Sequence, residues 1–170
     1  MSTAVRRLSP NDWAVWREIR LRALAESPDA FGSTLERERR FGEHDWRLRL
    51  AAPGLVVESA GRPVACAAIF EPAPGTAAVV AMWVAPDHRG RGLCQRMLDR
   101  LVPWAQTRGD RVVLSVNRAN PRARAAYEAY GFAPTGEEHP LREGSAQVCD
   151  VLALTTALPR DTVAEHVEPR

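Results

Sequence analysis

Apolar and polar positions along the chain follow periods that change from segment to segment. We expect a first strand over Thr3–Leu8, and Ser9-Pro10 then resembles the N-cap and first residue of a helix. Apolar residues recur at near-helical spacing from there to about Glu26, namely Trp13, Trp16, Ile19, Leu21 and Leu24. After a polar stretch, residues 43–51 predict a second, short helix that carries Trp46.

Beyond Pro53-Gly54 the pattern becomes that of strands. Residues 55–59 and 63–70 are rich in β-forming residues, and Ala60-Gly61-Arg62 between them predicts a hairpin. Residues 76–85 form a near-continuous apolar run. Such a run is typical of a strand that is buried on both faces of a sheet.

The second half of the chain alternates between helices and strands. Residues 90–108 predict a helix that Pro103 should kink or break. The apolar face of this helix is formed by Leu93, Met97, Leu98, Leu101 and Ala105. Residues 121–130 predict a short helix, and strands are expected over 112–116, from Phe132 onward and over 147–155. The expected order is therefore β-α-α-β-β-β-α-β-α-β-β.

Length and composition fit a single α/β domain over residues 1–170, with a polar, flexible tail over 158–170. Apolar residues make up 45% of the chain and charged residues 26%. No run approaches the roughly 18 consecutive apolar residues of a membrane span, and the N-terminus lacks the apolar core of a signal peptide. We therefore expect a cytoplasmic protein without a membrane partner.

Charge and metal-binding residue types argue against two further classes of function. The formal net charge is +2, and basic residues are interspersed with acidic ones, which disfavours nucleic-acid binding. The 3 cysteines and 4 histidines are scattered without metal-ligand spacing. We therefore expect neither a nucleic-acid partner nor a metal site.

A glycine-containing turn joins the apolar run to the next helix within Val84–Cys94. A helix N-terminus has unpaired N–H groups and a partial positive charge, so it can hold a phosphate. Gly90 and Gly92 let the backbone approach a ligand, and Arg89 and Arg91 add positive charge. The spacing is neither GxGxxG nor GxxxxGK[ST], which disfavours a dinucleotide fold and excludes a P-loop. The turn is either a phosphate site or an ordinary strand-to-helix connection.

The segment Arg89-Gly90-Arg91-Gly92-Leu93-Cys94 resembles the R/Q-x-x-G-x-G/A signature of the GNAT family of N-acetyltransferases. The resemblance implies that this segment binds the pyrophosphate of acetyl-CoA through backbone amides. It also implies that the preceding Met82-Trp83-Val84 runs beside the pantetheine arm. The backbone N–H of Val84 would then face the thioester carbonyl and stabilise the oxyanion of the tetrahedral intermediate.

Cys94 departs from the family pattern, which has Gly or Ala at this position. A thiol at a helix N-terminus can have a lowered pKa, which would suit a nucleophile. A thiolate beside a pyrophosphate would be repelled, however, and the family transfers the acetyl group directly. We therefore interpret Cys94 as a tolerated small residue of the turn.

A second motif lies on the predicted helix 121–130 and its ends, where Asn120 is an N-cap and Gly131 a helix stop. This stretch resembles the family motif N-x-x-A-x-x-x-Y-x-x-x-G-F at Asn120, Ala123, Tyr127, Gly131 and Phe132. The resemblance implies that Tyr127 protonates the departing thiolate and that Asn120 and Ala123 contact the cofactor. The alternative is that Tyr127 is a packed core aromatic and Asn120 only a cap. Two motifs in the family's order favour the catalytic interpretation.

The resemblance also implies the fold. It predicts a mixed, mostly antiparallel sheet of about seven strands, flanked by helices and splayed between the fourth and fifth strands, where the cofactor enters. The close match covers residues 82–132. In the family, the region after the first helices usually covers the acceptor, so Phe31 and its neighbours are expected to line the substrate pocket. Relatives are often dimers, which leaves a homodimer open.

The general base has no clear candidate in the sequence. Many relatives place a glutamate on the fourth strand, but residues 76–85 contain no acid. Glu71, Glu36 and Glu38 are candidates, although each is more typical of a solvated surface carboxylate. A chain of waters is an equal alternative.

Three functions compete. The leading one is acetyl transfer from acetyl-CoA to a primary amine of a small molecule, such as a polyamine, an amino acid or an aminoglycoside-like compound. The second is acetylation of a protein N-terminus or lysine, and the third is an acyl-CoA-binding module without catalysis. The intact Tyr127 and the phosphate turn argue against the third.

Overall fold

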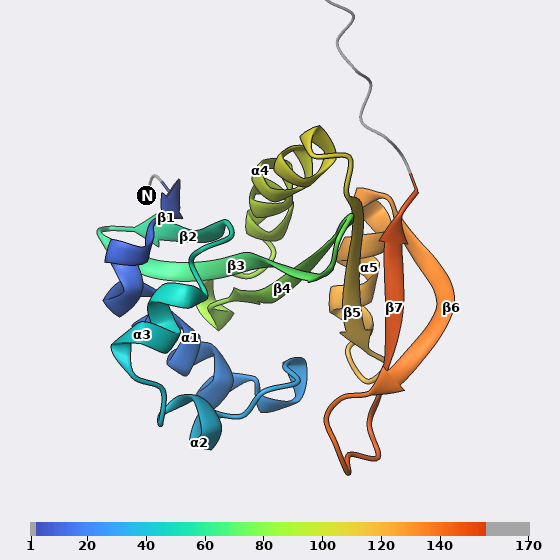
Figure 1. Cartoon of the computed structure of the whole chain (residues 1–170), viewed down its shortest axis with the longest axis horizontal. Coiled ribbons are helices and arrows are strands. Elements are labelled where there is room, and N and C mark those ends of the chain that lie inside the picture. Colours follow the sequence, from blue (N-terminus) through green and yellow to red (C-terminus); the bar gives the residue numbers. More distant parts are fainter. Residues whose placement is uncertain (1–2, 156–170) are drawn as a thin grey trace, which may run out of the picture.

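Seven strands form a single sheet in the computed structural model, which describes residues 3–155 (Figure 1). The strands are β1 (Thr3–Leu8), β2 (Gly54–Ser59), β3 (Arg62–Ala73), β4 (Thr76–Val84), β5 (Arg111–Asn117), β6 (Phe132–Pro140) and β7 (Val148–Leu154). The helices are α1 (Trp13–Glu26), α2 (Leu35–Glu38), α3 (Glu43–Leu48), α4 (Leu93–Thr107) and α5 (Pro121–Tyr130). Short 3₁₀ turns occupy Pro10–Asp12, Pro28–Ala30 and Pro86–His88.

The sheet opens between its fourth and fifth strands. The strand order is β1-β2-β3-β4-β5-β7-β6, and all neighbours are antiparallel except β4 and β5. This parallel pair matches residues 76–78 with residues 111–113 only. Within residues 3–155, the rest of β4 pairs with β3 alone, so β4 and β5 diverge toward their C-terminal ends. The predicted mixed sheet, splayed between strands four and five, is confirmed.

Helices cover both faces of the sheet. Figure 1 shows α1 and α3 on one side of the first four strands and α4 on the other, with α5 beside β5. Large side chains without exposed surface fill both layers, among them Ile19, Leu24 and Trp46 on the α1 side and Met97, Leu98 and Leu101 from α4. Trp46 is thus a core residue, in edge contact with the ring of Phe41.

The apolar run of β4 is not buried on both faces, and that prediction is wrong. Ala77 and Val79 are buried, whereas Val80 is 37% exposed. Past Ala78 only β3 pairs with this strand within residues 3–155, so the other edge of β4 is open as well. Because alanine and valine occupy both faces of this strand, its composition conceals the difference.

The helix predicted over residues 90–108 begins later than expected. It also continues past Pro103, where a kink or break was expected. Gly90 and Gly92 have φ angles of +74° and +73°, which a right-handed helix excludes, so α4 begins at Leu93. The helix continues past Pro103 to Thr107. Of the predicted kink or break at Pro103, the break is therefore wrong, because proline removes only one hydrogen bond while buried neighbours hold the helix on the sheet.

Two other predictions differ in their boundaries. The polar stretch before α3 contains the one-turn helix α2, and α3 ends at Leu48 instead of residue 51. Helix α5 has the predicted bounds. The predicted tail over 158–170 lies outside the described residues. No helix within residues 3–155 is long and apolar enough to cross a membrane.

Candidate active site

A cavity of about 760 Å³ opens where β4 and β5 separate. Its walls come from the end of α1, the end of β4, the beginnings of α4 and α5, and the end of β5. The sequence-predicted residues that line it are Met82, Trp83, Val84, Arg89, Gly90, Gly92, Leu93, Cys94, Asn120, Ala123 and Tyr127. Two motifs that are separate in sequence thus meet at one cavity.

The turn before α4 lines this cavity. Gly90 and Gly92 both adopt a left-handed conformation that glycine tolerates best, and Gly92 serves as the N-cap of α4. The first intrahelical bond runs from the Arg96 N–H to the Gly92 carbonyl, at 3.1 Å. The N–H groups before it have no carbonyl of the helix to bond. The guanidinium of Arg122, which sequence reasoning missed, lies near Gly90 and adds positive charge.

The two arginines of the turn differ from the prediction that both would serve a pyrophosphate. Arg89 donates from Nε to the Val84 carbonyl at 2.9 Å and from Nη2 to Glu26 Oε2 at 2.8 Å. Arg91 donates to the Asp87 carbonyl at 2.9 Å and does not line the cavity. Arg89 therefore fixes the end of β4, and the backbone of the turn carries the candidate phosphate site.

A bulge turns the end of β4 toward the cavity. Cys66 lies opposite Trp83, whereas Ala68 lies opposite Val80, so β4 has one extra residue there. Ala81, inside the bulge, has a φ of +56°. The bulge interrupts the alternation of side chains, and three consecutive residues, 82–84, line the cavity.

Helix α5 brings a buried phenol to the same cavity. Tyr127 is 8% exposed, and no group within residues 3–155 forms a hydrogen bond with its hydroxyl. Burial raises the pKa of Tyr127 well above its usual value, with a smaller contribution from Cys94. The phenol therefore keeps its proton at neutral pH and can act as an acid. Asn120 caps the helix, accepting from the Ala123 N–H at 3.1 Å.

Cys94 also faces the cavity, but as a thiol. Burial raises its pKa to about 11. A thiolate is therefore scarce at neutral pH, which argues against a nucleophilic role.

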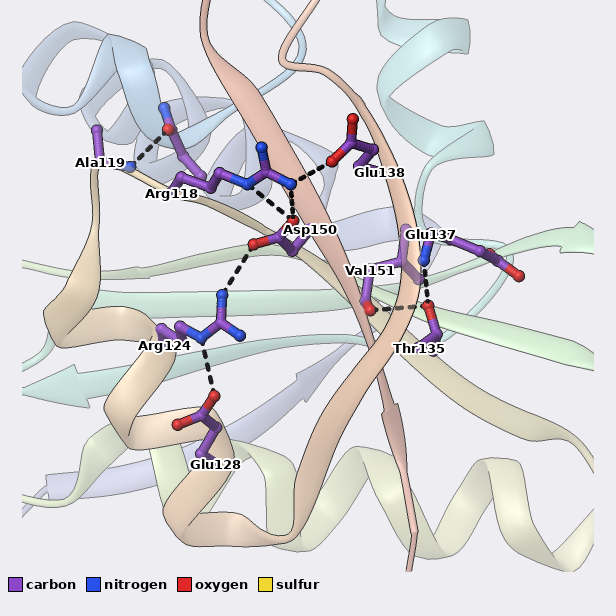
Figure 2. A network of polar contacts seen from close by, with 10 residues as sticks. Arg118, Ala119, Arg124, Glu128, Thr135, Glu137, Glu138, Asp150 and Val151 are labelled. Carbon is purple, nitrogen blue, oxygen red and sulfur yellow. Dashed lines mark hydrogen bonds and ion pairs between the residues drawn. The ribbon is translucent and has the colours of Figure 1, made fainter.

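An ion network fastens α5 to the sheet (Figure 2). Asp150 of β7 accepts from Arg124 of α5 at 2.8 Å and from Arg118, just after β5, at 2.7 Å. Arg124 also donates to Glu128 at 2.8 Å, and Arg118 to Glu138. The hydrogen bond from Arg118, with the further bond from Arg124, lowers the pKa of the Asp150 carboxyl. This network positions the helix that carries Tyr127.

A further part of the cavity wall is polar, and its residues Glu26, Asn117 and Gln147 were missed by sequence reasoning. Asn117 at the end of β5 is 6% exposed. Its Nδ2 donates to the Asp29 carbonyl at 2.9 Å and to Gln147, and its Oδ1 accepts from the Ala119 N–H at 2.9 Å. Glu26, the last residue of α1, bonds Arg89 and also the indole Nε1 of Trp83, at 2.8 Å. No local sequence pattern marks these contacts.

The three carboxylates proposed as bases lie away from the cavity. Glu38 is 1% exposed and is held by Arg20 through two hydrogen bonds of 2.8 and 3.0 Å. Glu36 and Glu71 pair with Arg40 and Arg108.

The expected acceptor loop contributes only in part. Residues 28–30 line the cavity, but Phe31 does not, because it packs under the guanidinium of Arg20 at 4.6 Å. In the part of the chain that the structure describes, no three His, Cys, Asp or Glu side chains converge as a metal site requires.

A second cavity of about 770 Å³ adjoins the first. Glu26, Trp83 and His88 line both cavities. The remaining wall of the second cavity comes from α1, the β2–β3 turn and the segment after β4.

Comparison with known proteins gives one family. The sequence model of the acetyltransferase (GNAT) family matches residues 15–132. The mycothiol acetyltransferase of Beutenbergia cavernae is 34% identical over 121 residues, which are 70% of this chain and 40% of that protein. The match thus spans less than half the length of this relative.

Solved structures share the fold. A GNAT acetyltransferase from Streptococcus pneumoniae superposes with a TM-score of 0.75 at 16% identity, over 89% of this chain and 98% of the other. A Salmonella typhimurium acetyltransferase solved with its cofactor acetyl-CoA superposes with a TM-score of 0.73 at 20% identity, over 95% and 99%. At these identities the likeness concerns the fold alone.

Proposed function

Because the chain belongs to the GNAT family of acetyltransferases, which use acetyl-CoA, we propose that it transfers an acetyl group directly to a primary amine of a small molecule. We further propose one acetyltransferase domain, since the family match and the single sheet span most of the chain.

One observation carries the proposal. The same 760 Å³ cavity is bordered by the unpaired N–H groups at the start of α4 and by the buried hydroxyl of Tyr127. A helix N-terminus suits the pyrophosphate of acetyl-CoA, and a protonated phenol suits a departing thiolate. Acetyl transfer is the chemistry that needs both.

The residues around the cavity fit the cofactor. The proposed phosphate-binding turn is Gly90–Cys94, with Arg122 beside it as a further cation. Small side chains at Ala123 and Ala126 leave room along α5 for a slender arm. When bound, acetyl-CoA would supply an activated thioester, whose acetyl carbon the neutral amine attacks. Tyr127 would donate its proton to the departing thiolate, and the proton that the amine loses would pass to water. The backbone N–H of Val84 would stabilise the carbonyl oxygen.

Cavity size supports a small acceptor. The first cavity is assigned to acetyl-CoA, and the adjoining second cavity, of about 770 Å³, is in the size range of small-ligand sites. The Beutenbergia cavernae relative is named for mycothiol and not for a protein substrate.

The test is release of CoA thiol from acetyl-CoA in the presence of putrescine, L-alanine, kanamycin or an alanine-starting peptide. We expect thiol release and N-acetylated product with at least one of the three small amines. Turnover with the peptide alone would replace a small acceptor by a protein N-terminus. No acetylated product with any acceptor, although acetyl-CoA binds, would contradict the proposed transferase function.

A further inference from the structure

Glu26 lies where the two cavities meet. It is the last residue of α1, and its side chain is 34% exposed. No other acidic side chain within residues 3–155 lines both cavities. Asp29 lines only the first cavity, and Asp87, which lines only the second, is turned toward His88 at 2.9 Å. Arg22 and Arg62 also line the second cavity and Arg122 the first, so Glu26 is the negative charge that a cation in either cavity would meet.

The two oxygens of this carboxylate are used unequally. Oε2 accepts from the Trp83 indole at 2.8 Å, from Arg89 at 2.8 Å and from the Ser27 hydroxyl. Oε1 accepts no hydrogen bond from any residue between 3 and 155. The side chain is thus held in one orientation by three donors, and its second oxygen keeps its full capacity to accept.

The surroundings keep Glu26 ionised and close to the proposed reaction centre. Burial disfavours the charged form, but hydrogen bonds from Ser27, Trp83 and Arg89 prevail and lower the pKa of the carboxyl. The guanidinium of Arg89 links Glu26 to the Val84 carbonyl at 2.9 Å. The Glu26 carboxylate is therefore connected to the end of β4 through the side chain of Arg89.

We infer that Glu26 Oε1 receives the ammonium group of the acceptor, so that this residue selects amines that are cationic in solution and holds them beside the end of β4. There the ammonium passes a proton to water before the neutral amine attacks. A charge-assisted hydrogen bond to a fixed carboxylate oxygen is among the stronger polar contacts available to an alkylammonium. The inference rests on the proposed function and names the residue that recognises its acceptor.

The test is Glu26→Gln, which preserves a carbonyl oxygen for Trp83 and Arg89 but places an amide NH₂ where Oε1 stood. The control is Glu18→Gln on the same helix, whose side chain is 53% exposed and lines neither cavity. The acceptor is whichever of putrescine, L-alanine and kanamycin the wild type acetylates. Steady-state kinetics give KM and kcat for the amine, and calorimetry gives the Kd of acetyl-CoA.

We expect Glu26→Gln to raise the KM for the amine about 10- to 100-fold, as the loss of one charge-assisted bond predicts. The kcat should change less than about 3-fold, and the Kd of acetyl-CoA less than about 2-fold, as in the Glu18→Gln control. An unchanged amine KM would overturn the inference and leave the proposed function intact. A joint loss of kcat and acetyl-CoA binding would also overturn it, because Glu26 would then serve only to hold Trp83 and Arg89.

Failure of the proposed function has a different signature. If the wild type releases no thiol with any of the three amines, both the proposed function and the inference fall, whatever the variant does.

Discussion

Two parts of the wall of the first cavity are built on different principles. In the proposed phosphate turn, neighbouring residues supply backbone groups: the left-handed Gly90 and Gly92 and the first N–H groups of α4. In the polar part around Glu26, side chains from distant segments meet. Glu26 bonds Trp83 and Arg89, which are 57 and 63 residues away in sequence. A site made of local backbone is recognisable in a sequence, whereas one made of distant side chains requires the fold.

The largest effect is expected at the buried ion pair beside the expected acceptor loop. Arg20 and Glu38 join α1 to α2 beside Phe31, and Arg20 Nη1 is buried with no hydrogen-bond partner among residues 3–155. Glu38→Ala should lower the free energy of unfolding by about 3 to 5 kcal/mol, because it leaves an uncompensated buried cation. Chemical denaturation measures this value.

The matched control is Glu36→Ala, in the same short helix. The side chain of Glu36 is 82% exposed in its pair with Arg40, so the loss should stay within about 0.5 kcal/mol. Equal losses in the two variants would show that the acceptor-side loop does not depend on this buried pair.

A change in the backbone of the proposed phosphate turn should weaken the binding of acetyl-CoA. Gly92→Val forces a β-branched residue into a φ of +73° and displaces the N–H groups of the proposed phosphate turn. We expect the Kd of acetyl-CoA to rise about 100- to 10,000-fold, which corresponds to the loss of about two charge-assisted hydrogen bonds. Isothermal titration calorimetry gives the Kd.

Gly109→Val controls for the strain itself. Gly109 has a φ of +77° and, like Gly92, has open space where a Cβ would stand, but it follows the far end of α4. This variant should lose stability similarly and bind acetyl-CoA as the wild type does. Weakened binding in both variants would mean that strain, and not the turn, accounts for the loss.

The smallest catalytic effect is expected at Tyr127. A thiolate is a fair leaving group, so Tyr127→Phe should lower kcat about 10- to 1000-fold with little change in the Kd of acetyl-CoA. Because burial raises the pKa of Tyr127, its proton is still present at alkaline pH, and wild-type kcat should not fall between about pH 8 and 10 for loss of this acid.

Tyr130→Phe is the control on the same helix, since Tyr130 faces Asp99 and does not line the cavity. Wild-type turnover in Tyr127→Phe, or an equal loss in Tyr130→Phe, would leave Tyr127 as a packed core aromatic. Turnover numbers at saturating substrate decide between these outcomes.

Much of the fold follows from local signals. Asn120, Pro121 and Gly131 delimit α5 with its observed bounds, because caps act within one turn of the chain. The burial of β4 does not follow, because its alanines and valines give both faces the same apolar character. Which positions of β4 are covered is decided by the elements that pack against the strand, a tertiary feature.

The candidate site likewise contains residues that local motifs predict and residues that they do not. Eleven of the twelve predicted site residues line the cavity, and the exception, Arg91, turns back to the Asp87 carbonyl. The roles of Glu26, Asn117 and Gln147 lacked any local pattern. The ion network of Asp150 with Arg118 and Arg124 was not predicted for the same reason, since these partners lie 32 and 26 residues from Asp150 in sequence.

The central claim is that the cavity between β4 and β5 binds acetyl-CoA. The most direct measurement is the melting temperature of the wild-type protein with and without acetyl-CoA, with NADH as the control nucleotide. At about 100 times its Kd, acetyl-CoA should stabilise the fold by about 2.7 kcal/mol and raise the melting temperature by about 5 to 10 °C, while NADH has no effect. No rise at millimolar acetyl-CoA, or an equal rise with NADH, would contradict the account.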